Sequence, residues 1–490
     1  MTTVSLDRLN LGMTPDPRDR ATGVSRLLQN FDTTQKQKLT PYRDMVLDNT
    51  VDLEANMDIY RITRILKANS NFYGFGDVSA ADTHAQVYVK VSPTNPISTW
   101  TTASSGSSID GGTRNDAMFI HYKTTNKLYG GNNFGLWSYD LTSPTFLHNE
   151  NTSIKAGPAL VHSKDDCLYV LSIGSTAVIA RNNAGSWNNA ALTLPSDVTS
   201  GDICENGNNI SIGVNRGSGN AVEYVWDRDA SLTTLSESID WGTGTLLFIE
   251  NLGGVRVGVF VENSLVPKLI LKYYTGTEVV VIAEYACSLA TIPSWKQKYN
   301  NSLLFLAELT MNGVAYKGLW KLTKTSSGFT FALDRLPRND TALGTGSLKG
   351  FYRTGDYVFI SYLNPVDSKY TVWRTNDQAS YAATSVTQTT INPGMPEADR
   401  TKMKKLIAVA LSTEPLPANA TATLKYRVDG GAWTTVLAET TDGNITTEMT
   451  MDASGTEFTD GREYEFAIES TGGAEITEVK YKYQIIPTLI

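Results

Sequence analysis

The stretch Lys127-Leu-Tyr-Gly-Gly-Asn-Asn-Phe-Gly-Leu-Trp-Ser-Tyr139 shows the pattern that decides the fold. Two short runs of apolar and aromatic residues are separated by a loop rich in Asn and Gly. Aromatic residues favour strands, and Asn and Gly supply the positive φ that tight turns need. The stretch therefore predicts two strands joined by a turn.

This two-part unit recurs seven times between about residues 65 and 395, at a spacing of roughly 40–55 residues. The first strand of the unit occurs as Asn71-Phe-Tyr-Gly-Phe, Lys127-Leu-Tyr-Gly, Cys167-Leu-Tyr-Val-Leu, Asn209-Ile-Ser-Ile-Gly, Val255-Arg-Val-Gly-Val, Ser302-Leu-Leu-Phe-Leu and Tyr357-Val-Phe-Ile-Ser. The second occurs as Gln86-Val-Tyr-Val, Gly135-Leu-Trp-Ser-Tyr, Ala177-Val-Ile-Ala, Glu223-Tyr-Val-Trp, Leu269-Ile-Leu-Lys, Gly318-Leu-Trp-Lys and Thr371-Val-Trp-Arg.

A four-stranded propeller blade has about this length, and a closed ring of blades buries the faces that a single blade leaves exposed. We therefore predict an all-β chain with a β-propeller of about seven degenerate blades over residues 61–395. Six or eight blades are the alternatives, because the unit has no WD dipeptide at a fixed offset and no kelch double glycine. Four tryptophans at corresponding points are expected to pack between blades, with ligand stacking as the alternative: Trp137, Trp226, Trp320 and Trp373.

The first 60 residues have a different pattern, and we predict that residues 1–60 form an extended arm. Val24, Leu27, Leu28 and Phe31 have the spacing of one face of a short helix. Residues 1–45 carry seven basic and five acidic side chains, a balance of +2 in an acidic chain. The residues expected to dock the arm onto a subunit or adaptor are Arg18, Arg20, Arg26, Leu27, Leu28, Phe31, Pro41, Tyr42 and Arg43.

A second β domain is predicted over residues 405–490, after the break at Asn392-Pro-Gly-Met-Pro. Apolar and polar residues alternate there with a period of two, and Asp-Gly pairs mark the turns. This pattern predicts an Ig-like or jelly-roll-type β-sandwich. Its expected core residues are Tyr426, Trp433, Phe466 and Tyr481.

Composition excludes several classes of function. The net charge of −8, from 42 basic and 50 acidic residues, argues against a surface that coats nucleic acid. The three cysteines and four histidines show no metal-ligand spacing, and we find no nucleophile elbow or phosphate-binding loop. No signal-peptide core and no run of 18 apolar residues is present. We therefore predict no cofactor, no metal, no catalytic residue and no membrane insertion.

A propeller glycosidase is the catalytic alternative, because such enzymes use paired carboxylates. The candidate acids are Asp165-Asp166, Asp227 with Asp229, and Asp334, and Ser108-Ile-Asp110 faintly resembles a sialidase aspartate box. The loops Asn132-Asn-Phe-Gly and Asn182-Asn-Ala-Gly-Ser-Trp187 have residues that bind sugars, although Asn and Gly also serve as turn residues.

The arm contains Leu11-Gly-Met-Thr-Pro-Asp-Pro-Arg, Gly23, Asn30-Phe-Asp and Leu39-Thr-Pro-Tyr-Arg, and it resembles the start of tail nozzle and neck-type proteins of tailed bacteriophages. The C-terminal Leu424-Lys-Tyr-Arg-Val-Asp-Gly-Gly-Ala-Trp433 and Glu463-Tyr-Glu-Phe are similar to sandwich modules of phage tail proteins. The resemblance covers about a quarter of the chain.

This resemblance implies a non-enzymatic structural component of the virion tail, assembled in the host cytoplasm. It also implies copies of the chain in a ring, commonly six-fold, that contacts other tail or neck proteins and lets DNA pass without specific binding. Two alternatives remain: a tail protein that binds host-surface glycans or receptors, and a propeller glycosidase.

Overall fold

The structure is a computed structural model that describes residues 1–6, 13, 25–29, 31–32, 38–42, 45–47, 62–77, 85–90, 100–102, 114–132, 134–229, 235, 237–289, 294–311, 313–326, 328–335, 347–355, 357–363, 370–375 and 385–487. Strands dominate these residues, which also include short 3-10 turns such as Lys123–Thr125 and Glu397–Asp399. Among the described residues no helix is long and apolar enough to span a membrane. The prediction of an all-β chain is confirmed.

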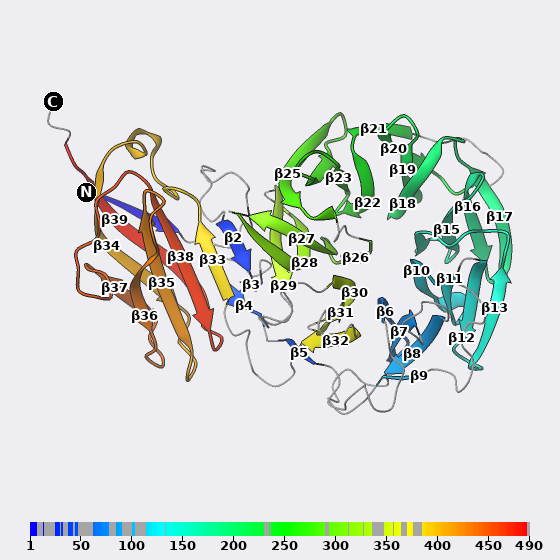
Figure 1. Cartoon of the computed structure of the whole chain (residues 1–490), viewed down its shortest axis with the longest axis horizontal. Helices are drawn as coiled ribbons and strands as arrows, with labels where there is room; N and C mark the ends of the chain where they lie inside the picture. The colour runs from blue at the N-terminus through cyan, green and yellow to red at the C-terminus, as the bar shows by residue number, and fades with distance from the viewer. Residues whose placement is uncertain are drawn as a thin grey trace. The chain divides into compact units, whose positions relative to one another are not determined.

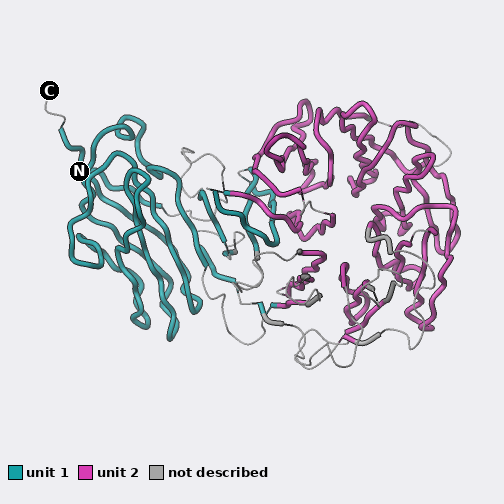
Figure 2. Tube along the Cα trace, viewed as in Figure 1, with its two compact units in different colours: residues 1–46, 311–339, 375–490 teal, residues 47–310, 340–374 magenta. Residues whose placement is uncertain are grey.

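The chain forms two compact units, each assembled from separate stretches (Figure 2). Unit 1 contains residues 1–46, 311–339 and 375–490, and unit 2 contains residues 47–310 and 340–374. The domains predicted from the sequence are consecutive, whereas unit 1 joins stretches from both ends and the middle of the chain.

Unit 2 consists largely of antiparallel sheets in which consecutive strands pair along the chain (Figure 1). Four complete sheets have four strands each. They are β6 (Arg64–Ala68), β7 (Asn71–Asp77), β8 (Ala85–Lys90) and β9 (Thr101–Thr102); β10 (Arg114–Tyr122), β11 (Lys127–Asn132), β12 (Gly135–Asp140) and β13 (Thr145–Asn151); β14 (Ala159–Val161), β15 (Leu168–Ile173), β16 (Ala177–Asn183) and β17 (Ser186–Thr193); and β18 (Val198–Asn206), β19 (Asn209–Arg216), β20 (Asn220–Trp226) and β21 (Glu237–Thr243).

Three further groups follow: β22 (Thr245–Leu252), β23 (Val255–Glu262), β24 (Lys268–Tyr274) and β25 (Val279–Cys287); β26 (Lys296–Tyr299) and β27 (Ser302–Met311); and β30 (Ser347–Thr354), β31 (Tyr357–Leu363) and β32 (Tyr370–Thr375). Glycine turns set the register of such hairpins. Leu252 pairs with Val255 across Gly253 and Gly254, whose φ values of 58° and 86° fit a two-residue turn with positive φ at both positions. A succession of small meandering sheets is propeller-like.

Large aromatic side chains fill the space between successive sheets of unit 2. Trp137 on β12 is fully buried, with its ring 5.1 Å from that of Phe75 on β7. Trp226 on β20 is also buried and lies 5.9 Å from Tyr169 on β15. Gly130 stands opposite Trp137 in the sheet, and a Cβ atom there would lie 2.1 Å from the indole. A glycine is therefore required for the indole to lie flat against the strand.

Unit 1 contains two four-stranded groups (Figure 1). One has the order β1 (Thr2–Leu6), β39 (Ile476–Ile485), β34 (Lys404–Thr413) and β37 (Thr446–Met449); the other has β33 (Ser385–Thr389), β38 (Tyr464–Thr471), β35 (Thr421–Val428) and β36 (Thr434–Glu439). On the other side of β33 the strand order continues with β2 (Ser25–Gln29), then β29 (Gly328–Arg335), then β28 (Val314–Thr325). The short strands β3 (Phe31–Asp32), β4 (Thr40–Pro41) and β5 (Met45–Leu47) complete the N-terminal stretch.

The predicted tryptophans and sandwich-core residues differ in how deeply the structure buries them. Trp320 is buried against Phe331, with ring centroids 5.2 Å apart, whereas Trp373 is only partly buried. Tyr426, Phe466 and Tyr481 are buried in unit 1. Trp433 is instead partly exposed and lies 4.6 Å below the Arg427 guanidinium, because it follows a turn rather than occupying a paired strand.

The predicted helix around residues 24–31 is wrong, since residues 25–29 form strand β2. This strand lies between β33 and β29, and Leu27 and Leu28 are both buried. A central strand is covered on both faces, so its apolar residues need not alternate. Arg26 pairs with Glu465 at 2.7 Å, and Phe31, Pro41 and Tyr42 are buried. Docking onto a neighbouring subunit stays a prediction, and Arg18, Arg20, Val24 and Arg43 lie outside the described residues.

Candidate ligand site in unit 2

The candidate site is a cavity of about 460 Å³ in the middle of unit 2. Its wall takes residues from, or directly beside, the first strand of each successive group: β6, β10, β14, β18, β22, β26 and β30. Figure 1 shows these groups arranged around a common centre within the unit. The volume lies in the range of small-molecule sites, which are mostly apolar with a few fixed polar groups.

Aromatic side chains form much of the apolar wall. Phe119 and Phe248 are buried, whereas Trp295 and Tyr352 are partly exposed beside the cavity. Trp295 directly precedes β26, so its side chain is placed at the end of the strand rather than within a paired region. An aromatic ring that is only partly covered can stack on an apolar face of a ligand.

Lys296 is the polar centre of the wall. Its Nζ lies 2.7 Å from Asp202 Oδ2 on β18 and 3.3 Å from Glu250 Oε2 on β22. The same ammonium donates to the carbonyl oxygens of Ile203, at 3.1 Å, and Ile249. Its three hydrogens therefore face four acceptors, which leaves no donor for a ligand anion.

Electrostatics keep this lysine charged. Burial opposes the charged form, but attraction by Asp202 and Glu250 outweighs burial and raises the pKa of Lys296. Burial also raises the pKa of Asp202, against the opposing effect of Lys296, while the backbone N–H of Ile249 donates to its carboxylate at 2.8 Å. Glu250 has a second cation, Lys298, at 3.5 Å. The Lys296 cluster thus contains paired charges rather than one free charge.

His121 on β10 also borders the cavity. Burial lowers the pKa of its imidazole, so the ring is neutral at pH 7. His162 is buried elsewhere: its Nδ1 accepts from the Lys164 N–H at 3.2 Å, and its Nε2 lies 3.2 Å from the Asn209 oxygen. His148 packs beside Phe146, and His84 lies outside the described residues.

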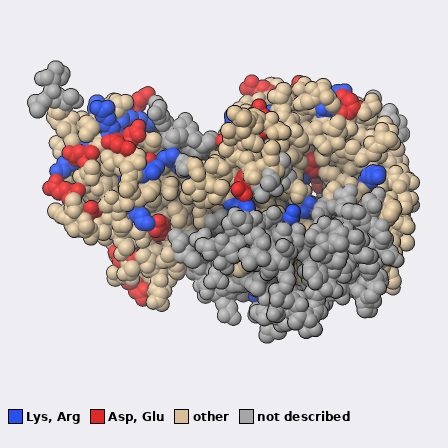
Figure 3. Space-filling view, in the orientation of Figure 1, with Lys and Arg blue, Asp and Glu red and all other residues tan. Residues whose placement is uncertain are grey.

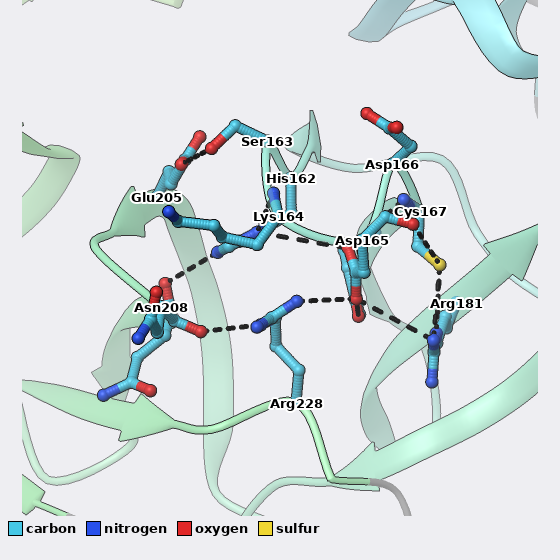
Figure 4. Close-up of polar contacts among 12 residues, drawn as sticks. His162, Ser163, Lys164, Asp165, Asp166, Cys167, Arg181, Glu205, Asn208 and Arg228 are labelled. Atoms are coloured by element: carbon cyan, nitrogen blue, oxygen red, sulfur yellow. Dashed lines mark hydrogen bonds and ion pairs between the residues drawn. The ribbon is translucent and has the colours of Figure 1, made fainter.

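The structure connects Asp165, one of the acids singled out from the sequence, to two arginines (Figure 4). Arg228 lies 2.7 Å and Arg181 3.8 Å from Asp165 Oδ2, and the Tyr169 hydroxyl donates to the same oxygen at 2.7 Å. Arg181 also donates to the Cys167 sulfur at 3.3 Å. Because the carboxylate is enclosed by donors, this cluster joins strands and is not a free acid.

The other candidate acids do not form a pair. Asp227 accepts from the Asp229 N–H at 3.0 Å in a local turn, and Asp334 lies in unit 1 beside Lys321. Asp110 lies outside the described residues. In the two suspected sugar-binding loops, Asn132 accepts from the Gly135 N–H and Asn182 from the Gly185 N–H. Both asparagine side chains thus act as turn residues.

Sequence reasoning missed Asp202, Trp295 and Lys296, which line the cavity, and Glu250, which pairs with Lys296. They are far apart in sequence and carry no shared motif. The one available signal is charge within a strand: Lys296-Gln-Lys-Tyr299 places two lysines where a buried first strand of a sheet is expected. Within the described residues, no group of three or more His, Cys, Asp or Glu side chains could hold a metal ion.

No family model and no curated protein matches the chain. Among solved structures, the chain is similar to exo-β-1,3-galactanase from Phanerochaete chrysosporium in complex with β-1,3-galactotriose, at 10% identity and a TM-score of 0.32, over 90% of this chain and 100% of that one. It is similar to Trypanosoma rangeli sialidase at 11% identity and a TM-score of 0.34, over 99% and 96%. It is also similar to BBS1N in complex with ARL6DN, at 10% identity and a TM-score of 0.40, over 69% and 98%.

Two predictions are corrected here. Neither the structural role in a phage tail nor the absence of enzymatic activity is retained; the matched solved structures include a galactanase and a sialidase, whose likeness to this chain concerns the fold alone. The predicted self-assembly, partners and location in a virion stay predictions.

Proposed function

We propose that unit 2 is a seven-bladed propeller and that the two four-stranded groups of unit 1 form a β-sandwich. Seven first strands contribute to one cavity, and the last of them, β30, packs against the first, β6, which supports a closed ring. In unit 1, the rings of Phe466 on β38 and Tyr481 on β39 lie 5.0 Å apart, which supports face-to-face packing of their two sheets.

We infer that the cavity of unit 2 binds a saccharide. The observation that carries this proposal is the pairing of aromatic rings, Trp295 and Tyr352, with a fixed polar cluster in one cavity of about 460 Å³. A pyranose offers an apolar face to an aromatic ring and hydroxyl groups to polar side chains. The volume accommodates one or two sugar rings in the size range of small-molecule sites.

The charge distribution favours an uncharged saccharide. Lys296 has no free donor, and Asp202 and Glu250 are both held by it. Figure 3 shows that uncharged residues dominate the described surface of unit 2 in that view. A ligand carboxylate beside the Lys296 cluster would find no free cation to pair with, and burying an unpaired charge is costly.

Hydrolysis of a glycosidic bond is the second candidate function, favoured by the Asp202 and Glu250 pair. Retaining glycosidases use two carboxyl groups about 5–5.5 Å apart, and the Asp202 and Glu250 carboxylates both contact the Lys296 ammonium, at 2.7 and 3.3 Å. Burial raises the pKa of Asp202, the direction that a general acid needs, while the ion pair with Lys296 favours the carboxylate. In this reaction Asp202 would protonate the leaving oxygen while Glu250 displaces it from the anomeric carbon, and water, deprotonated by the Asp202 carboxylate, would then cleave the Glu250 glycosyl ester and restore both carboxyl groups.

Titration of the full chain with a panel of neutral and anionic oligosaccharides tests the binding proposal. We expect calorimetric binding of neutral members and at least about tenfold weaker binding by Trp295→Ala. Trp433→Ala is the matched control, because this partly exposed tryptophan also lies beside an arginine but belongs to unit 1. Absence of binding by every oligosaccharide would overturn the proposal.

Release of reducing ends from the sugars that bind tests hydrolysis separately. We expect Asp202→Asn and Glu250→Gln each to abolish it, with circular dichroism confirming that both variants fold. Binding without any release, under conditions where Trp295→Ala weakens binding, would leave the binding function and remove the enzymatic one.

A further inference from the structure

Arg64 lies where the first and last strands of the cavity wall meet. Its Nη1 donates to the carbonyl oxygens of Thr63, at 2.7 Å, and Lys349 on β30, at 3.0 Å. Its Nη2 donates to the carbonyl oxygen of Ser294 at 3.3 Å. Although it is an arginine, the residue is only 2% exposed. One guanidinium therefore joins three separate stretches of unit 2.

The same guanidinium covers the ring of Trp295. Its central carbon lies 4.8 Å from the centroid of the indole, within the range of a cation–π contact. Ser294, whose carbonyl accepts from Arg64, directly precedes Trp295 in the chain. Arg64 thus contacts both the backbone before Trp295 and one face of its side chain.

Strand β30 and the residues that lead into β6 approach each other closely. A Cβ atom on Gly350 would lie 2.2 Å from the carbonyl oxygen of Thr63, so β30 can reach this position only with a glycine. The hydroxyl of Ser361 also donates to the carbonyl oxygen of Ile62. The position of Arg64 is therefore determined by the contact between the first and last strands of the wall.

We propose that Arg64 is a positioning residue that fixes the Trp295 indole beside the cavity. Because Arg64 is held where β30 packs against β6, the position of this indole, the ligand platform, depends on the contact between these two strands. The part concerning a saccharide rests on the proposed function above. Lysine cannot replace arginine here, because a single ammonium lacks the planar fork that serves separate carbonyls while stacking on a ring. Without Arg64, the indole would sample several rotamers, and ligand binding would have to order it.

The proposal is tested with the full chain labelled with 5-fluorotryptophan, in which each of the nine tryptophans contributes one fluorine resonance. Trp295→Phe identifies the resonance of Trp295. We expect Arg64→Lys to shift or broaden that resonance and to leave those of Trp137 and Trp226 unchanged. Arg353→Lys is the matched control, because Arg353 stacks at the same distance of 4.8 Å on the ring of Tyr299, another aromatic residue of unit 2.

Saccharide titration gives the second measurement. We expect Arg64→Lys to weaken binding about tenfold and Arg64→Lys with Trp295→Ala to bind no more weakly than Trp295→Ala alone, since both changes remove the same platform. If Arg64→Lys does not fold, Arg64→Gln retains a donor for the carbonyls and gives the same comparison.

An unchanged Trp295 resonance in Arg64→Lys, or an equal change in Arg353→Lys, would overturn the positioning role. If the natural chain binds no saccharide but the Trp295 resonance responds to Arg64→Lys, the positioning role holds and the proposed function fails. The two failures are therefore distinguishable.

Discussion

Two buried lysines, one in each unit, make the same kind of ion pair in different surroundings. In unit 1, Lys321 lies 3.0 Å from Asp334, and the side chains are 2% and 0% exposed. The Tyr42 hydroxyl donates to Asp334 and accepts from Lys321, which closes the group. In unit 2, Lys296 lies 2.7 Å from Asp202, but it is 16% exposed and borders a cavity.

The difference teaches that a buried ion pair does not mark a functional site by itself. The unit 1 group has no ligand access in the described structure, and its hydrogen bonds are satisfied internally, so it serves packing. The Lys296 cluster ties β18, β22 and β26 together and also forms part of a cavity wall. The two ion pairs therefore differ in whether they border a cavity that a ligand can enter, and not in their charge.

The largest effect is expected from Lys321→Met. It leaves the Asp334 carboxylate buried without its cation, which costs about 3–5 kcal/mol of folding free energy. Urea denaturation of the full chain measures this loss. Lys402→Met is the control, because the Lys402 side chain is 48% exposed beside Asp399, at 3.1 Å, and an exposed ion pair contributes little to stability. Equal losses in the two variants would contradict the distinction.

Lys296→Met is expected to cost somewhat less, about 2–3 kcal/mol, although it removes a cation from two carboxylates. Water in the cavity can solvate Asp202, and Lys298 remains beside Glu250. The same denaturation experiment applies, and adding Asp202→Asn should recover part of the loss. A loss larger than that of Lys321→Met would mean that the cavity does not relieve the unpaired charges.

Asp165→Asn extends the comparison to a partly exposed cluster. The change weakens the contacts of Arg228 and Arg181, whose side chains are 15% and 28% exposed and can regain water. We expect a loss of about 1–2 kcal/mol in the same denaturation measurement. Arg181→Lys, which affects the weaker contact at 3.8 Å, should cost less, and the reverse order would contradict the assignment of Arg228 as the main partner.

The smallest effect concerns Glu439 in unit 1, a carboxylate held by hydrogen bonds instead of a lysine. Donation by Thr447, Thr441 and Asn444 lowers the pKa of Glu439 to about 2. A lowered acid pKa stabilises the folded state above the unfolded value of 4.5, and this contribution disappears as the pH falls toward 2. Glu439→Gln should therefore cost about 1 kcal/mol at pH 7 and almost nothing at pH 2 in denaturation experiments. A pH-independent cost would contradict this cause.

Much of the fold was predictable because its signals are local. The repeated runs around Tyr129 and Trp137 correspond to β11 and β12, and those around Tyr169 and Ile179 to β15 and β16. These are the middle strands of their sheets, which are apolar on both faces. The prediction for the N-terminal stretch was wrong, because the spacing of Leu27 and Leu28 fits one face of a helix and also fits a strand that is buried on both faces.

The candidate site was not predictable in the same way. The strands that border the cavity include β14, with three residues, and β26, with two lysines in four positions. Short strands of this kind carry little periodic signal. The acids that the sequence does suggest, such as Asp165 and Asp227, lie in turns or clusters away from the cavity wall.

The sequence by itself determined the all-β class, the repeated hairpins and the absence of familiar catalytic motifs, since strand alternation and turn chemistry involve residues close together in the chain. Only the tertiary structure decided that residues 1–46 join residues 311–339 and 375–490 in one unit. It also decided that Asp202, Glu250 and Lys296 meet, and that Arg64 covers Trp295. These contacts join residues that are 46 to 231 positions apart, and their partners depend on how the sheets pack, which no local pattern records.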